Sequence, residues 1–158
     1  MSVPQVALVT GGSKGIGAAI VRRLSTDGFI VVVNYSKNSV PADALVAELK
    51  DAGCKALAIC CDVANSDDVS QMFDKIESEL GPVNVLINNA GIMKNAPVAQ
   101  SEEQDFDQQI AVNLKGTFNT LKQAANRMPN EGRIVNLSTS VVGLKREKYG
   151  IYAATKSA

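Results

Sequence analysis

Short apolar runs alternate with longer amphipathic segments along most of the chain. The apolar runs predict five strands, over residues 5–10, 29–35, 55–61, 83–88 and 133–137. The run Val31–Val33 is apolar at every position, which is typical of a strand that is buried on both faces. The segments between the runs predict four helices. Regular alternation of strand and helix requires a parallel sheet with right-handed crossovers and helices on both faces.

The periodicity of each amphipathic segment predicts which side chains face the core. For the four helices in order, these are Ile16, Ala19, Ile20 and Leu24; Leu45, Val46 and Leu49; Val69, Met72, Phe73, Ile76 and Leu80; and Phe106, Ile110, Leu114, Phe118 and Leu121. Ser66 is the predicted N-cap of the third helix. The last helix is predicted to open at Ser101 and to end before Pro129.

A glycine-rich turn, T-G-G-S-K-G-I-G, spans residues 10–17 between the first strand and the first helix. Gly11 allows a sharp turn, Gly15 leaves the backbone open to a pyrophosphate, and Gly17 allows close packing of helix on sheet. Backbone N–H groups at the new helix N-terminus favour phosphate charge. The turn therefore predicts nucleotide binding, and the alternative is an ordinary glycine-rich turn of an α/β protein.

Composition narrows the class of protein. A chain of 158 residues, 46% hydrophobic and 20% charged, fits one globular domain over residues 1–158. Sixteen basic and sixteen acidic residues balance, so electrostatics favours neither a nucleic-acid nor a membrane partner. No apolar run approaches the length of a membrane span, and no leader pattern precedes the first strand.

The chain has three cysteines and no histidine. The odd cysteine count without a leader indicates a reducing compartment and hence a cytoplasmic location. Cys60 and Cys61 lie in an apolar run, where small packing residues are expected, and no cluster of metal ligands is seen. The absence of histidine excludes Ser-His-Asp and Cys-His mechanisms, so acid–base chemistry must use other groups.

Three more motifs follow the glycine turn in order: N-N-A-G at residues 88–91, S-T-S-V-V-G at 138–143 and Y-A-A-T-K at 152–156. Together with an asparagine at position 113, they make the chain resemble the classical short-chain dehydrogenase/reductase family, in its 3-oxoacyl-carrier-protein-reductase-like branch. The resemblance implies a Rossmann-type doubly wound parallel sheet in three layers. It also implies an NAD(P)-dependent oxidoreductase that acts on a small carbonyl or alcohol substrate.

The resemblance places a catalytic tetrad on Asn113, Ser140, Tyr152 and Lys156. Ser138 is an alternative to Ser140, because alternation along a strand would put both hydroxyls on one side. Tyr152 and Lys156 are i and i+4, so a helix would put them on one face. A free tyrosine is a poor base at neutral pH, and a nearby ammonium favours its phenolate. The resemblance also implies that Lys156 hydrogen-bonds the nicotinamide ribose and that Asn113 holds a water molecule in the proton relay.

The end of the second strand indicates which dinucleotide is used. An NAD enzyme of this type has an acidic residue about 20 positions after the glycines, and residues 34–37 read N-Y-S-K. Lys14 and Lys37 can face a 2′-phosphate, so NADP is expected over NAD, unless both lysines are only solvated. The residues expected at the cofactor are Gly11, Ser13, Lys14, Gly15, Ile16, Gly17, Asn34, Tyr35, Ser36, Lys37, Asp62, Val63, Asn89, Ala90, Gly91, Tyr152 and Lys156. Asn88 and Asn89 have a structural alternative, which is to tie the sheet edge together.

The sequence stops at Ala158, two residues after Lys156, whereas members of the resembled family continue well beyond this point. We therefore expect a C-terminally incomplete chain, an unpaired fifth strand, and a homo-oligomer for the complete protein. Three hypotheses remain: an NADP-dependent oxidoreductase, a non-catalytic dinucleotide-binding module, and an inactive fragment of such an enzyme.

Overall fold

One parallel sheet organises the computed structural model, which describes residues 4–144 and 146–158. Its strands are β1 (Val6–Val9), β2 (Ile30–Tyr35), β3 (Ala56–Cys60), β4 (Val83–Asn88) and β5 (Arg133–Asn136), in the order β3-β2-β1-β4-β5. Val9 pairs with Val33 on one side and with Ile87 on the other. The order reverses between β1 and β4, so the predicted Rossmann-type doubly wound sheet is confirmed.

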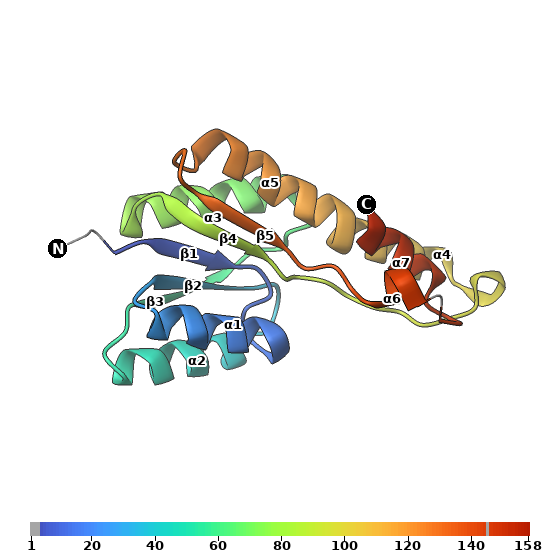
Figure 1. Ribbon diagram of the computed structural model, residues 1–158, viewed down its shortest axis with the longest axis horizontal. Helices are drawn as coiled ribbons and strands as arrows, with labels where there is room; N and C mark the ends of the chain where they lie inside the picture. Colours follow the sequence, from blue (N-terminus) through green and yellow to red (C-terminus); the bar gives the residue numbers. More distant parts are fainter. Residues whose placement is uncertain (1–3, 145) are drawn as a thin grey trace.

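Helices cover both faces of the sheet (Figure 1). Helices α1 (Gly15–Thr26) and α2 (Val40–Asp51) lie on one face, and α3 (Ser66–Leu80) and α5 (Gly116–Arg127) lie on the other. A hydrophobic core lies on each face of the sheet, and alternate residues of β1 point into one or the other. Leu8 packs with Phe73 and Met72 in one core, and Val9 packs with Val21 and Leu45 in the other. The predicted buried faces of α2 and α3 are confirmed.

The segments beyond β4 and β5 extend past the carboxyl ends of the strands (Figure 1). After β4 come the 3-10 turn η1 (Val98–Gln100), helix α4 (Glu103–Gln109) and the π-helical turn η2 (Ile110–Lys115), which runs into α5. After β5 come two short helices, α6 (Val141–Leu144) and α7 (Gly150–Ser157). The long helix predicted after Ser101 is thus interrupted by a π turn, a feature that often marks functional sites.

The predicted buried face of α1 is wrong at its first turn. Ile16 is 68% exposed and Ala19 is also exposed, whereas Gly17, Ala18 and Val21 are buried. A Cβ on Gly17 would lie 2.5 Å from the carbonyl oxygen of Gly11. This close approach of helix to loop turns the Gly17 side of the helix inward, and apolar periodicity alone does not reveal it.

Three of the five residues in the predicted apolar stripe of the α4–η2–α5 segment are exposed, whereas Ile110 and Leu121 are half-buried. Phe106, Leu114 and Phe118 are 45%, 39% and 60% exposed. The buried positions of the segment are mostly polar: Gln109, Asn113, Asn119 and Thr120. These side chains bond to groups in the interior; Asn119 Nδ2, for example, donates to the carbonyl of Val63 at 2.9 Å. Buried polar side chains of this segment thus pair with groups of other elements, which apolar periodicity does not register.

The N-cap of α3 is Asn65 and not the predicted Ser66, because the Asn65 side chain accepts from the N–H groups of Asp67 and Asp68.

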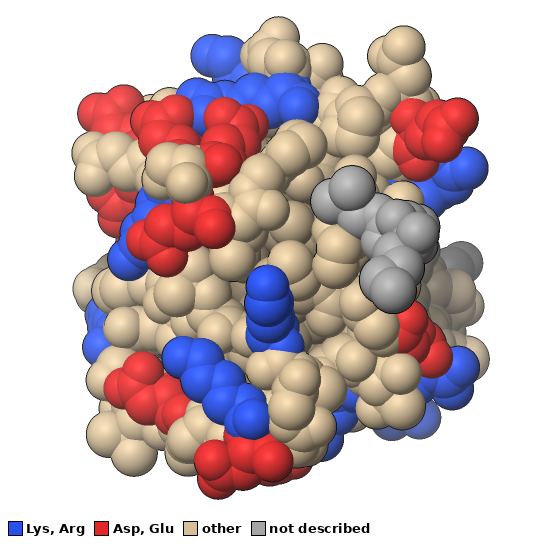
Figure 2. All heavy atoms as spheres, turned by 90° about the vertical axis from the view of Figure 1, so that its left-hand side faces the viewer, with Lys and Arg blue, Asp and Glu red and all other residues tan. Residues whose placement is uncertain are grey.

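None of the helices in the described part of the chain combines the length and hydropathy that a bilayer crossing requires. Figure 2 shows the face that carries the amino ends of the strands, where several acidic side chains gather at the upper left and basic side chains lie beside them.

Candidate active site at the carboxyl edge of the sheet

The glycine turn bends sharply between β1 and α1. Gly11 and Gly15 have φ values of +59° and +56°, a region that side chains disfavour. A Cβ on Gly12 would lie 2.9 Å from the carbonyl oxygen of Val9, and a Cβ on Gly15 would meet nothing within 4 Å. Gly12 and Gly17 therefore serve packing, whereas Gly15 lies open. The sequence reasoning missed the packing role of Gly12.

Helix α1 begins at this turn without a side-chain cap among the described residues. Lys14 is its N-cap and makes no side-chain capping bond to the residues that the structure describes, and the first turn has no acidic side chain. Helix α3, in contrast, is capped by Asn65 and carries Asp67 and Asp68 in its first turn. The N–H groups at the start of α1 are therefore available to an anion, and those of α3 are not.

Asn34 does not have the ligand-facing position expected of it. Its side chain is only 2% exposed. Its Oδ1 accepts from the N–H of Gly11 at 3.1 Å, and its Nδ2 donates to the carbonyl of Cys61 at 3.0 Å. Asn34 therefore fixes the glycine turn to the end of β3. From sequence, an asparagine that hydrogen-bonds nearby backbone groups cannot be distinguished from one that contacts a ligand.

Thr10 and Asn89 join the glycine turn to the end of β4. Thr10 Oγ1 accepts from the N–H groups of Asn89 and Ala90, both at 3.0 Å. Asn89 Nδ2 donates to the carbonyls of Thr10 and Gly11 at 2.9 and 3.0 Å. Asn88 bonds through Nδ2 to Asn136 and through Oδ1 to Thr120. These bonds agree with the alternative that Asn88 and Asn89 tie the edge of the sheet together and have a structural role.

Three predicted site residues meet just beyond this junction. A Cβ on Gly91 would lie 3.3 Å from Asn113 Oδ1 and 3.4 Å from Lys156 Nζ. Lys156 Nζ donates to the carbonyl of Leu137 at 3.0 Å, and burial lowers the pKa of this ammonium. Tyr152 lies one helical turn before Lys156 in α7 and is half-buried. Residues from β4, η2 and α7 thus converge at the edge where the glycine turn lies.

Three hydrogen bonds to protein groups hold the side chain of Asn113. Oδ1 accepts from the N–H of Ile92, and Nδ2 donates to the carbonyl of Ile92, both at 2.8 Å. Nδ2 also donates to Thr155 Oγ1 at 3.0 Å. Both amide protons have partners, whereas Oδ1 accepts one bond and can still accept another from a relay water.

The two candidate serines have different surroundings. Ser138 Oγ donates to the carbonyl of Lys156 at 2.9 Å and so holds the end of α7. Ser140 is exposed, lies in the turn before α6, and bonds through its side chain to no other residue in the described ranges. Strand β5 ends at Asn136, so the strand alternation that made the serines equivalent does not extend to them.

The end of β2 leaves two basic groups exposed near its last residues. Tyr35 is half-buried, and Ser36 and Lys37 are exposed, as are Lys14 and Ile16 at the start of α1. Neither Lys14 nor Lys37 forms an ion pair with a residue that the structure describes. Ser13 is half-buried. Both ammonium groups are therefore available to an external anion.

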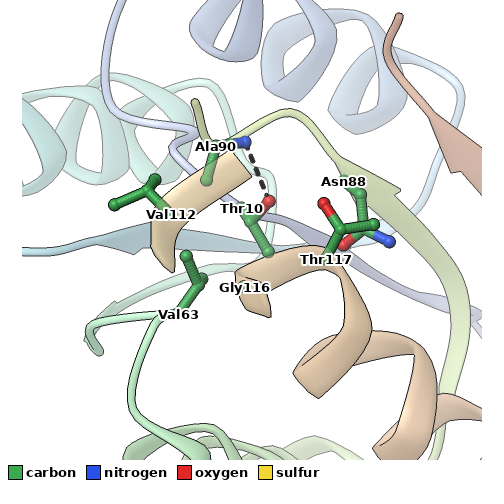
Figure 3. A pocket seen from close by; sticks show the side chains of 7 residues that line it. All are labelled: Thr10, Val63, Asn88, Ala90, Val112, Gly116 and Thr117. Carbon is green, nitrogen blue, oxygen red and sulfur yellow. Dashed lines mark hydrogen bonds between the residues drawn. The ribbon is translucent and has the colours of Figure 1, made fainter. Parts of the chain in front are cut away.

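Asp62 and Val63, expected near the cofactor, follow β3. Asp62 is exposed and accepts through Oδ1 from the N–H of Ala64, whereas Val63 is buried beneath Gly116 of α5. Val63, Ala90 and Thr10 line a crevice with Asn88, Val112, Gly116 and Thr117 (Figure 3). This crevice is too narrow for a water molecule, so it is a packing gap at the π turn and holds no ligand.

A family model described as short chain dehydrogenase matches residues 5–158. The chain is 38% identical over 159 residues to a 3-oxoacyl-[acyl-carrier-protein] reductase FabG of Staphylococcus aureus, covering 99% of this chain and 65% of that protein. The chain therefore spans about two thirds of the length of this curated relative.

Solved structures with the same fold include two dinucleotide complexes. A short chain dehydrogenase from Burkholderia cenocepacia, in complex with NADP, matches 99% of this chain and 64% of its own, with a TM-score of 0.93 and 34% identity. A blue fluorescent protein from a metagenomic library, in complex with NADPH, matches 97% of this chain and 63% of its own, with a TM-score of 0.91 and 40% identity.

Proposed function

This chain belongs to the short-chain dehydrogenase family, and from that premise we propose that the protein transfers hydride between a nicotinamide dinucleotide and a carbonyl or secondary alcohol group of a small molecule. One observation carries the proposal. Gly91, Asn113 and Lys156 meet at the carboxyl edge of the sheet, next to the glycine turn. This edge is where open α/β sheets bind ligands. The dinucleotide, when bound, supplies or accepts the hydride.

The residues around the glycine turn fit a dinucleotide. Gly15 is open, the first turn of α1 has free N–H groups and no acidic side chain, and both favour a pyrophosphate. Lys14 and Lys37 are exposed, and residues 34–37, which read N-Y-S-K, contain no carboxylate. Both features favour binding of a 2′-phosphate and therefore of NADP over NAD. The NADP and NADPH complexes of the two structural relatives support this preference.

Tyr152, Lys156 and Ser140 have distinct proposed roles at the reacting group. Tyr152 exchanges a proton with the substrate oxygen, and Ser140, whose hydroxyl is exposed, donates a hydrogen bond to that oxygen. Lys156 is held by the carbonyl of Leu137, one helical turn after Tyr152, and places a positive charge at the site. The burial that lowers the pKa of Lys156 also strengthens its field at the site.

The test is consumption of NADPH by the protein in its full natural length. The panel should include 3-oxoacyl thioesters, because one relative is named for that substrate, and small ketones. Tyr152→Phe should lower kcat by roughly a hundredfold or more, whereas Tyr149→Phe, at the N-cap of α7, should retain activity. Saturable NADPH binding without turnover of any substrate would instead favour a non-catalytic dinucleotide-binding module.

The cofactor preference has a separate test. Lys14→Ala and Lys37→Ala should each weaken binding of NADPH about tenfold and leave binding of NADH nearly unchanged, because only NADPH carries the 2′-phosphate. Lys122→Ala, an exposed change on α5, is the matched control. Equal losses for both dinucleotides would remove the argument for NADP.

A further inference from the structure

Thr155 connects the two elements that carry the proposed reacting groups. It lies between Tyr152 and Lys156 in α7, and its side chain is 4% exposed. Its Oγ1 accepts from Asn113 Nδ2 at 3.0 Å and donates to the carbonyl of Tyr152 at 2.8 Å. One hydroxyl thus joins η2 to the backbone of the residue proposed to exchange the proton.

Elementary chemistry fixes the direction of this chain of hydrogen bonds. The N–H of Ile92 can only donate, so Oδ1 of Asn113 must face it and Nδ2 must face Thr155. Thr155 has one proton, which it gives to the carbonyl of Tyr152, and it must therefore accept from Asn113. No alternative orientation keeps all of these bonds.

The other attachments of α7 are less protected. Ser138 bonds the carbonyl of Lys156 at an exposed position, and the bond from Lys156 Nζ to Leu137 is only partly buried. In the described part of the chain, the bond between Asn113 and Thr155 is the one fully buried side-chain hydrogen bond that joins α7 to another element. This buried contact therefore fixes where α7 lies relative to η2.

We propose that Thr155 is a positioning residue, which holds α7 against Asn113 and so sets the place of the Tyr152 hydroxyl relative to the loop after β4. This inference rests on the proposed function, because positioning matters only if Tyr152 exchanges a proton. Thr155 is buried, and its hydroxyl bonds protein groups on both sides. The same bonds engage the Asn113 side chain, which gives Asn113 a part in positioning as well.

Three variants of the protein in its full natural length test the role. Thr155→Val removes the hydroxyl and preserves shape, and Thr155→Ser preserves the hydroxyl. Ser157→Ala is the matched control, because among the described residues Ser157 Oγ bonds only the carbonyl of Ala153, in the same helix. Readouts are kcat and KM per folded molecule, the solvent deuterium isotope effect, NADPH affinity, and hydrogen–deuterium exchange of the amides at 150–157.

The proposal expects a specific pattern. Thr155→Val lowers kcat roughly ten- to a hundredfold, raises the solvent isotope effect because proton transfer limits the rate more, and leaves NADPH affinity within about twofold. It also speeds amide exchange in α7. Thr155→Ser restores kcat to within about threefold of the parent, and Ser157→Ala changes none of these quantities. If Thr155→Val does not fold, Thr155→Ala takes its place in the comparison with Thr155→Ser.

Two results would overturn the inference. One is an unchanged kcat and unchanged α7 exchange in Thr155→Val, and the other is a Thr155→Ser protein that is as slow as Thr155→Val. Failure of the proposed function looks different. In that case the parent protein turns over no substrate, and the exchange experiment still reports whether Thr155 anchors α7.

Discussion

Strands β1 and β5 lie in the same sheet, separated only by β4, and have opposite surroundings. Every residue of β1 is at most 1% exposed, whereas all four residues of β5 are exposed, with Ile134 at 43% and Val135 at 47%. Apolar side chains of α1, α2 and α3 cover both faces around β1. The region around β1 is therefore held by packing, whereas β5 and α7 are held largely by backbone pairing and a few polar contacts.

The difference teaches how stability and chemistry are divided in this molecule. The glycine turn belongs to the packed region, and the proposed reacting groups Tyr152, Lys156 and Ser140 belong to the lightly packed one. Substitutions around β1 should mainly change the free energy of unfolding. Substitutions in and around α7 should mainly change turnover. The site lies where the two regions meet, at Ala90 and Gly91.

The largest expected effect compares one buried side chain in each region. Phe73→Ala should lower the free energy of unfolding by about 3–5 kcal/mol, because the ring is fully buried against β1. In the 158-residue chain, Val135→Ala on β5 should cost less than about 1 kcal/mol, because this side chain is 47% exposed there. Chemical denaturation of both variants measures the difference. Equal losses would contradict the division into two regions.

A smaller effect is expected from adding one methyl group. In Gly17→Ala the new Cβ would lie 2.5 Å from the Gly11 carbonyl and 2.6 Å from Asn89 Nδ2. Backbone must move, so we expect a loss of about 1–3 kcal/mol and weaker dinucleotide binding. Gly143→Ala in α6 is the control, since a Cβ there meets nothing within 4 Å and should change stability by less than about 0.5 kcal/mol. Thermal unfolding and NADPH titration test both.

Lys156→Met should abolish turnover while changing stability little, because burial of the ammonium opposes the hydrogen bond to Leu137. Burial lowers the pKa of Lys156 in the folded state. Burying the charged ammonium therefore reduces the free energy of unfolding in full below that lowered pKa, and this reduction disappears as the pH rises toward the ordinary value of 10.5. The parent should therefore gain stability relative to Lys156→Met over this alkaline window. Denaturation at several pH values tests the sign, and the exposed Lys122→Met should show no such trend.

The smallest expected effect concerns two neighbouring thiols at the edge of the packed region. Cys60 is exposed, and Cys61 is 3% exposed. Burial, with smaller contributions from Asp68 and Asp62, raises the pKa of Cys61 from 9.0 to about 12. Iodoacetamide at mildly alkaline pH should label Cys60 and spare Cys61 in the folded protein, as read by peptide mass spectrometry. Labelling of Cys61 at the same rate would mean that this end of β3 opens readily.

The stability contribution of Cys61 has a defined pH window. Because its pKa is raised in the folded state, the thiol contributes its full stability below 9.0 and loses it as the pH rises toward about 12. This loss runs opposite to the gain expected from Lys156. Comparing each substituted protein with the parent therefore separates the two groups.

Some structural details could not be predicted, for a shared reason. Apolar periodicity identified the faces of α2 and α3, where the core is the main partner. It misplaced the faces of α1 and of the α4–η2–α5 segment, where a glycine contact and buried amide side chains decide the orientation. Local sequence does not record which distant backbone groups need partners. The hydrogen bonds that Asn34 makes to Gly11 and Thr155 makes to Asn113 could not be predicted for the same reason.

The sequence by itself determined the order of strands and helices, the parallel sheet, the place of the glycine turn and the motifs of the family. These follow from periodicity and from local backbone preferences, which depend on neighbours along the chain. Only the tertiary structure decided that Gly91, Asn113 and Lys156 meet, that Ser138 is engaged while Ser140 is exposed, and that Thr155 joins η2 to α7. Those outcomes depend on hydrogen bonds between residues far apart in the sequence, whose geometry exists only once the sheet has brought its carboxyl ends together.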